Sequence, residues 1–318
     1  MRLLFASITV LLLTLLLPQG AFAQNPVQWG GNAKSAIERA QSEHRPLLFW
    51  VSQGRDGDDE DDLEDAQSDS FRDPIVVSLA QKDFIPVRVS RNSRMLEEAQ
   101  KLGLPTTHGL YVALLSPDGK VLDQIDPGVV ANPQVFATRL VTALRSYRDS
   151  FYRDQLQKVV TAAESAKRDV RTALQFVWRL RILTADKDVI ALMDRKDLLP
   201  TEKRRLYQLM AAMCTQATVE KLLSLTAQGD KDAEGALAKA EPGALEFLLP
   251  HLPTAEGADA TQLAAYDAAA RIARFTGSRS PEFWKNAKPE DRTKEIDLLR
   301  GRAATVLEYW QEQVGRWR

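Results

Sequence analysis

The stretch Pro46-Leu47-Leu48-Phe49-Trp50-Val51-Ser52 is a short apolar run that begins at a proline. Its length and its large apolar side chains are typical of a strand buried within a sheet. After Gln53 it passes into the acidic stretch Gly54-Arg55-Asp56-Gly57-Asp58-Asp59-Glu60-Asp61-Asp62-Leu63-Glu64-Asp65. A buried strand that ends in a polar loop is a common place for a site in an α/β domain. This loop holds carboxylates but no thiol or imidazole, so it predicts a fold more strongly than a reaction.

The acidic loop, residues 56–65, is the candidate site for a divalent cation. Hard cations such as Ca²⁺ prefer carboxylate oxygens, and a bound cation would relieve the repulsion between the crowded like charges. The candidate ligands are Asp58, Asp59, Asp61 and Asp62, although their spacing is not that of an EF-hand loop. Two alternatives stay open. The loop is a solvated segment whose acidic end stabilises the following helix through its dipole, or it binds a basic partner.

Helix and strand signals alternate through residues 24–150. Pro46 disfavours helix at the residue before it, and Ser116-Pro117-Asp118-Gly119 has the residue preferences of a type I turn. Strands separated by helices imply parallel pairing, and the final hairpin adds an antiparallel strand. We therefore expect an α/β domain with a mixed central sheet flanked by helices. The expected helices are 32–42, 73–81, 93–102 and 133–147, and the expected strands are 46–52, 84–89, 110–115 and 120–125.

Several short segments of this region occur in a familiar order. They are Trp29 with the helix after it, Arg45-Pro46-Leu47-Leu48-Phe49, Ser70-Phe71-Arg72-Asp73-Pro74-Ile75, Phe84-Ile85-Pro86-Val87-Arg88-Val89 and Ser116-Pro117-Asp118-Gly119-Lys120. In order and spacing they resemble the thioredoxin-like family, and the resemblance covers nearly all of residues 24–150. It implies a mixed sheet with helices on both faces.

The resemblance does not bring redox chemistry with it. Redox members of the family place Cys-x-x-Cys after the first central strand, which here falls near Glu60 and Leu63, and neither position is cysteine. They also have a cis-proline before the third strand, which here falls near Leu110. The single cysteine, Cys214, lies in a helical apolar pattern and is expected to be a small buried side chain. A dithiol oxidoreductase needs two thiols, so that activity is excluded.

The N-terminal residues 1–23 have the pattern of a signal peptide. Arg2 is followed by the apolar stretch Leu3 to Leu17, and Ala21-Phe22-Ala23 fits the small-x-small cleavage rule. The alternative is an uncleaved membrane anchor, but the apolar run is shorter than the roughly 20 residues of a spanning helix. No later stretch is long and apolar enough to span a bilayer. We expect export to a periplasm or to the extracellular space, without an integral membrane segment after cleavage.

Residues 151–318 carry helical patterns and no strand pattern. Ala264-Ala265 and Ala268-Ala269-Ala270 would let helices approach closely, and residues 241–276 resemble a HEAT-type helical pair. We expect an all-helical domain, either a short α-solenoid or a closed bundle. The second expected helix, 169–185, should bury Leu174, Val177, Trp178, Ile182 and Leu183.

The end of the chain is rich in tryptophan and in charge. Trp284, Trp310 and Trp317 are expected either to pack the core of the final helix or to form an aromatic binding patch. Mixed charges on that helix, including Arg292 and Glu295, predict a solvated face. The formal net charge of −1 gives no global attraction to nucleic acid.

These patterns lead to two hypotheses about function. The first is an exported, non-catalytic thioredoxin-like protein whose helical half binds a protein or peptide partner, with no cofactor. The second is a metal-dependent enzyme, or a cation-binding protein, that uses the acidic loop 56–65 to hold a weakly bound divalent cation.

Overall fold

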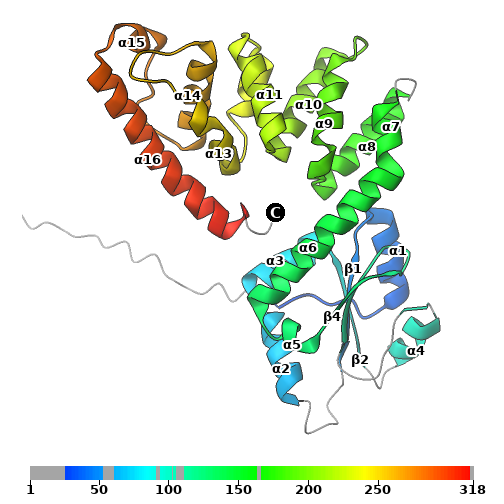
Figure 1. Ribbon diagram of the computed structural model, residues 1–318. Helices are drawn as coiled ribbons and strands as arrows, with labels where there is room; N and C mark the ends of the chain where they lie inside the picture. The colour runs from blue at the N-terminus through cyan, green and yellow to red at the C-terminus, as the bar shows by residue number, and fades with distance from the viewer. Residues whose placement is uncertain are drawn as a thin grey trace, which may run out of the picture.

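The computed structural model describes residues 26–52, 61–90, 94–101, 103–104, 111–162 and 166–315. Figure 1 shows an α/β part, formed by the first half of this chain, below an arc of helices formed by the second half. The expected combination of an α/β region followed by a helical region is therefore present. In the part of the chain that is described, no helix is both long enough and apolar enough to cross a membrane.

Within the described residues the sheet has four strands, in the order β2-β1-β3-β4. They are β1 (Leu47–Ser52), β2 (Ile85–Ser90), β3 (Tyr111–Leu115) and β4 (Val121–Ile125). β1 and β2 are parallel and β3 and β4 are antiparallel, as expected. Pro86 lies on the edge strand β2, where its carbonyl accepts a hydrogen bond from the amide of Gly30. The sheet thus places its one proline where a missing donor costs little.

The direction of β3 differs from the expectation, because β3 runs antiparallel to β1. Val51 is paired with Val89 on one side and with Tyr111 on the other, so β2 ends at the same edge of the sheet where β3 begins. The connecting helix α4 (Arg94–Lys101) has eight residues and is about 12 Å long. The whole connection, residues 91–110, would be long enough for a parallel crossover, so its length does not decide the direction of β3. The pairing shows that β3 starts at the edge of the sheet where β2 ends.

Both faces of the sheet are covered by helices, which explains the continuous apolar run of β1. Leu48 and Trp50 point to one core, which is closed by α2 (Asp61–Ser70), α3 (Pro74–Asp83) and α6 (Pro133–Phe151). Leu47, Phe49 and Val51 point to the other core, beneath α1 (Ala33–Glu43) and α4. Two short segments were not predicted: α5 (Pro127–Val130), and α2, which begins inside the acidic stretch.

A continuous helical rod joins the two halves of the chain. It consists of α6, a π-helical turn η1 (Tyr152–Leu156) and α7 (Gln157–Thr161). The boundary expected between residues 150 and 151 lies inside this rod, so the halves are not joined by a flexible linker. The packing changes a little earlier: Leu144 belongs to a core of the α/β part, and Tyr147 belongs to the core of the helical part.

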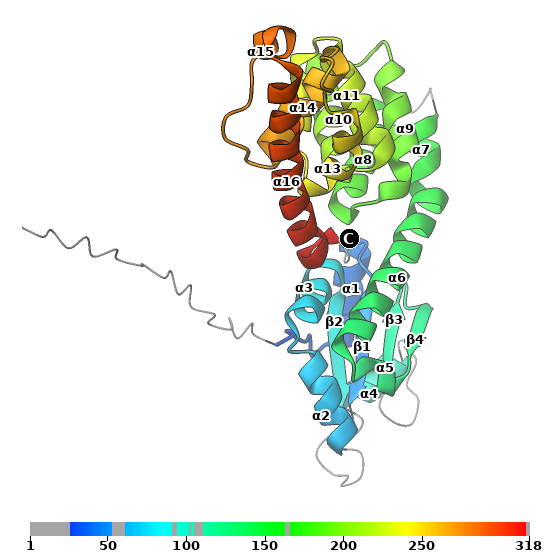
Figure 2. The same ribbon diagram turned by 60° about the vertical axis from the view of Figure 1, so that its left-hand side comes forward.

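The remaining helices stack in chain order along the arc. They pack on chain neighbours and also on helices two or three places along, as α10 does on α12 and α11 on α14. The last one, α16, turns back toward the α/β part in both views (Figures 1 and 2). Near its end, Trp310 lines a cavity of about 240 Å³ together with Arg145 of α6. The helices are α8 (Lys167–Leu180), α9 (Asp186–Ala191), α10 (Pro200–Met213), α11 (Gln216–Ala227), α12 (Lys231–Leu237), α13 (Leu245–Leu248), α14 (Ala260–Ile272), α15 (Pro281–Asn286) and α16 (Pro289–Gln313), with short 3₁₀ turns η2 (Leu183–Ala185), η3 (Leu192–Asp194), η4 (Pro242–Ala244) and η5 (Leu249–His251).

The expectations for the end of the chain are met in part. Trp284 is buried in the core against Tyr266, as the first alternative expected. Trp310 lies near the opposite end of α16, so the two do not form one aromatic patch. Trp317 lies outside the described residues. The charged face of α16 is not fully solvated either, since Glu295 is buried and accepts hydrogen bonds from Tyr266 Oη at 2.7 Å and from Arg279 Nε at 3.0 Å. Arg292 is also buried, and it donates to the Ala255 carbonyl.

An imidazole packs where the two halves meet. The ring of His44 contacts the rings of Phe151 and Phe176, at centroid distances of 5.0 and 4.7 Å. Burial, and next the Arg179 guanidinium, lower the pKa of His44 below its ordinary value of 6.5. A lowered pKa means that the folded chain binds this proton less readily than the unfolded chain. The stabilising effect is therefore complete above pH 6.5 and is lost as the pH falls through the lowered pKa.

We expect His44→Asn to remove this component of the pH dependence. Asparagine tolerates the left-handed backbone at this position, where φ is 50°. Urea unfolding at about pH 7.5 and about pH 5.5 should show a larger loss of stability in the wild type than in the variant. Carboxylates titrate in both proteins, so their contribution to the change in stability cancels when the variant is compared with the wild type. An equal loss in both would show that His44 is not the group responsible.

Candidate functional site

The acidic residues predicted as cation ligands lie largely beyond what the structure describes. Asp58 and Asp59 fall outside the described residues. Asp61 and Asp62 form the start of α2, and their side chains are likewise not described. Among the described residues, no cluster of histidine, cysteine, aspartate or glutamate is arranged to hold a metal ion. The cation hypothesis therefore stays a prediction.

The polar side chains next to the end of β1 form a bonded network. Arg88 lies over the ring of Trp50, 4.2 Å from its centroid, and donates to Ser52 Oγ and Glu64 Oε1, each at 3.0 Å. Trp50 Nε1 donates to the buried Gln67 at 3.1 Å. These contacts tie α2 to the sheet, and they satisfy the groups that a ligand would otherwise use.

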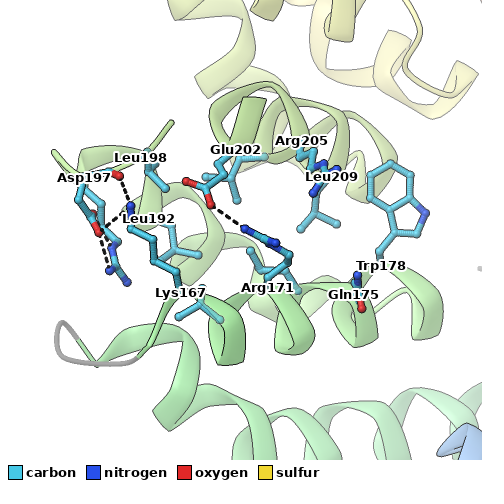
Figure 3. Close-up of a pocket in the computed structure, with 14 residues that line it drawn as sticks. Lys167, Arg171, Gln175, Trp178, Leu192, Asp197, Leu198, Glu202, Arg205 and Leu209 are labelled. Carbon is cyan, nitrogen blue, oxygen red and sulfur yellow. Dashed lines mark hydrogen bonds and ion pairs between the residues drawn. The ribbon is translucent and has the colours of Figure 1, made fainter. Parts of the chain in front are cut away.

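The helical half holds a groove lined by both apolar and charged side chains. It lies between α8 and α10, is closed at one end by the turn that follows α9, and encloses about 390 Å³ (Figure 3). This volume is in the range of a site for a small ligand or for a few side chains of a partner. The lining residues are Lys167, Val170, Arg171, Leu174, Gln175, Trp178, Leu192, Arg195, Asp197, Leu198, Glu202, Arg205, Leu206 and Leu209.

The floor of the groove is apolar because two helical stripes face each other without filling the space between them. Val170, Leu174 and Trp178 recur at helical spacing along α8, and Leu206 and Leu209 lie opposite on α10. Val177 of α8 is fully buried in the core of the helical half. The side chain one residue further along is turned by about 100° around the helix and faces the groove instead.

Trp178 was expected to be buried, and that expectation is wrong. Its exposed fraction is 48%, the largest for any tryptophan of the described residues. Figure 3 shows its ring at one end of the groove, beside Arg205 and Leu209. A large ring that is half covered by protein still has much apolar surface exposed to water.

One carboxylate at the rim is paired twice. Asp197 accepts hydrogen bonds from Arg195 Nε at 3.1 Å and Nη2 at 3.2 Å, and Lys167 Nζ lies 3.5 Å from its Oδ2. The Arg195 guanidinium, more than Lys167, holds the pKa of Asp197 below its ordinary value. Asp197 therefore stays ionised at neutral pH and its charge is balanced by the rim itself.

The other carboxylate bridges the groove. Glu202 accepts the backbone amide of Leu199 at 3.0 Å, which fixes the start of α10, and it accepts Arg171 Nη2 from α8 at 3.2 Å. The Leu199 amide, and then the Arg171 guanidinium, lower the pKa of Glu202. The ion pair joins the two walls at mid-length (Figure 3). It restricts their separation and keeps the groove in a defined shape.

One cation of the rim is left without such a partner. Among the residues that the structure describes, no carboxylate is paired with Arg205, which is exposed on α10. Lys167, Arg171 and Arg195 are already paired with the two carboxylates. The groove thus has four basic and two acidic residues, and its unpaired positive charge is that of Arg205, near the end of the groove that holds Trp178.

The groove has an apolar floor and an ion-paired rim. Its described lining has no serine, cysteine or histidine to act as nucleophile or base, and both carboxylates are held ionised in ion pairs. The single cysteine, Cys214, is buried at the end of α10, as expected. Comparison of the chain with models of known protein families and with curated proteins found no match.

The groove was not predicted from the sequence. Its lining comes from three separate segments, each of which carries an ordinary amphipathic pattern. The available signal was a broad apolar face on α8, where Leu174, Val177 and Trp178 span more of the helix surface than one packing stripe needs.

Proposed function

We propose that this chain is an exported, non-catalytic binding protein whose groove between α8 and α10 takes up apolar side chains of a partner protein. Its α/β half would be a thioredoxin-like domain without thiols, and its helical half a short HEAT-like stack. The mixed sheet with helices on both faces and the arc of helices support these two assignments. The signal-peptide pattern of residues 1–23 supports export.

The half-exposed Trp178 above an apolar floor carries the proposal. Binding energy at protein interfaces is concentrated in a few large side chains, tryptophan and arginine above all, next to pockets that exclude water. The groove combines Trp178 and Arg205 with leucines from both walls. Its ion-paired rim is already ordered, so little conformational freedom remains to be lost when a partner binds.

A selection with displayed random peptides of about 12 residues, long enough to follow the groove as a helix, tests the proposal. The full mature chain is the target, and enriched peptides are measured against Leu174→Lys and Trp178→Ala. We expect each variant to weaken binding by about thirtyfold, the factor of an interface hot spot. Lysine at position 174 would place a charge on the apolar floor, while its long stem can still reach solvent.

Leu298→Lys is the matched control, because Leu298 is 53% exposed on α16, away from the groove. It should leave binding unchanged, and circular dichroism should show all three variants folded. Enriched peptides that bind Leu174→Lys and Trp178→Ala as tightly as wild type would overturn the proposal. So would a selection that enriches nothing.

A further inference from the structure

We propose that the occupant of the groove is an amphipathic helix of a partner protein that carries a carboxylate beside its apolar row, and that Arg205 pairs with this carboxylate. This inference rests on the proposed function and makes it more specific. Three features of the groove support it: its walls, its length and the position of its unpaired cation.

The walls of the groove favour a helical occupant over an extended one. Both walls are α-helices, α8 and α10, whose interior amides and carbonyls are already used within each helix. An extended segment on this apolar floor would bury backbone amides and carbonyls without partners, at a cost in free energy for each. A helix satisfies its own backbone groups and presents only side chains. The walls are therefore suited to a helix that lies along them.

The length of the groove matches a short helix. From Lys167 to Trp178 the α8 wall is about 16 Å long. A partner helix of about 12 residues, or about 18 Å, would cover it and would place apolar side chains at positions i, i+4, i+7 and i+11 over the floor.

The charge of the groove indicates which polar side chains the partner helix should carry next to its apolar row. Asp197 and Glu202 are neutralised by cations of the rim itself, so they give no preference for a basic side chain on the partner. Arg205 presents its guanidinium toward the end of the groove that holds Trp178 (Figure 3). A planar guanidinium pairs with carboxylates through two parallel hydrogen bonds. The best occupant has an aspartate or glutamate next to the apolar residue that covers Trp178.

Three synthetic peptides of about 12 residues test this inference. They share leucines at i, i+4, i+7 and i+11, and their remaining positions are mainly glutamate, lysine or glutamine. A fourth peptide has the glutamate sequence with a central proline, which breaks the helix. Fluorescence anisotropy measures each peptide against the full mature chain and against Arg205→Glu, Arg300→Glu and Leu174→Lys. Arg300 is the matched control, because it is exposed on α16 and no carboxylate of the described residues is paired with it.

We expect the glutamate peptide to bind the wild type about tenfold more tightly than the lysine peptide, and the proline peptide to bind much more weakly. Arg205→Glu should abolish or reverse the preference for glutamate, and Arg300→Glu should leave it as it is. A preference that survives Arg205→Glu, or a proline peptide that binds as well as its parent, would overturn the inference.

The same measurements separate this inference from the proposed function. If the glutamine peptide binds the wild type and loses binding to Leu174→Lys, while charge makes no difference, the groove is a docking site but its occupant is not acidic. If no peptide depends on Leu174, both statements fail. Binding of nucleic acid or anionic vesicles that competes with the glutamate peptide would also count against a helical partner.

Discussion

Trp50→Ala is expected to lower the free energy of unfolding of the α/β part by about 4 kcal/mol, the cost of truncating a large aromatic side chain in a core. Trp50 is 1% exposed on the central strand β1. Its ring packs against Trp29 and Phe71, at centroid distances of 5.2 and 4.7 Å. The variant would also remove the indole N–H that donates to the buried Gln67, and the ring over which Arg88 lies. The loss therefore combines a cavity with a broken polar network.

Trp178→Ala is the matched control for this prediction, because it removes the same side chain from a site that is 48% exposed. We expect it to cost about 1 kcal/mol or less, as is usual for surface substitutions. Urea unfolding followed by circular dichroism measures both variants. Equal losses would contradict the burial of Trp50 on which the prediction depends.

Hydrogen exchange on Trp50→Ala also tests whether the two halves are separate units. The core that contains Trp50 includes no residue after Leu144 of α6, and the core of the helical part begins at Tyr147. Amides of β1 and β3 should lose protection in the variant, while amides of α10 and α11 should keep it. A uniform loss across the chain would show that the continuous rod makes the halves unfold together.

Most elements of the α/β part could be predicted from the sequence because their signals are local. The apolar run of β1 after Pro46 and the turn Ser116-Pro117-Asp118-Gly119 each act within a few residues, and the structure has a strand and a hairpin there. The short helices α2 and α5 were missed. The direction of β3 could not be predicted in this way. It depends on the edge of the sheet to which the connection of residues 91–110 returns the chain, which is a property of the connection and not of the strand.

The groove could not be predicted because it exists only where no other part of the described chain packs over the apolar face of α8. Leu174, Val177 and Trp178 all read as core residues, and only the spacing between α8 and α10 decides that Val177 is covered and Trp178 is not. Arg205 has the same ambiguity, since an arginine on a helix is ordinarily a solvated residue. It becomes a candidate binding residue only in the structure, where it lies near the exposed ring of Trp178 and where the carboxylates of the groove are paired with other cations.

The second large effect is expected at the buried ion pair that fastens α3 to the rod. Arg148 Nη2 lies 2.6 Å from Asp83 Oδ1, and the side chain of Arg148 is only 9% exposed. Burial lowers the pKa of Arg148, although Asp83 opposes the shift. Arg148 Nε has no hydrogen-bond partner among the described residues. The guanidinium therefore has a single carboxylate, that of Asp83, as its counter-charge in this position.

Asp83→Asn should lower the free energy of unfolding by about 3 kcal/mol, because it leaves a buried cation without its counter-charge. Asp69→Asn is the matched control. Asp69 pairs with Arg72 at 3.1 Å, but the two side chains are 75% and 67% exposed, so its loss should cost less than about 0.5 kcal/mol. Urea unfolding at neutral pH measures both. Equal effects would show that burial does not set the strength of the Arg148 pair.

Adding Arg148→Met to Asp83→Asn provides the decisive comparison. If the cost of Asp83→Asn comes from the uncompensated guanidinium, removing that guanidinium should restore most of the lost stability, although two polar contacts are then gone instead of one. If the cost instead comes from a contact of Asp83 that does not involve Arg148, the double variant should be no more stable than Asp83→Asn alone. The first outcome would show that the buried charge of Arg148 is tolerated only because Asp83 neutralises it. Since Asp83 is the last residue of α3 and Arg148 lies in α6, this requirement holds the end of α3 against the helical rod.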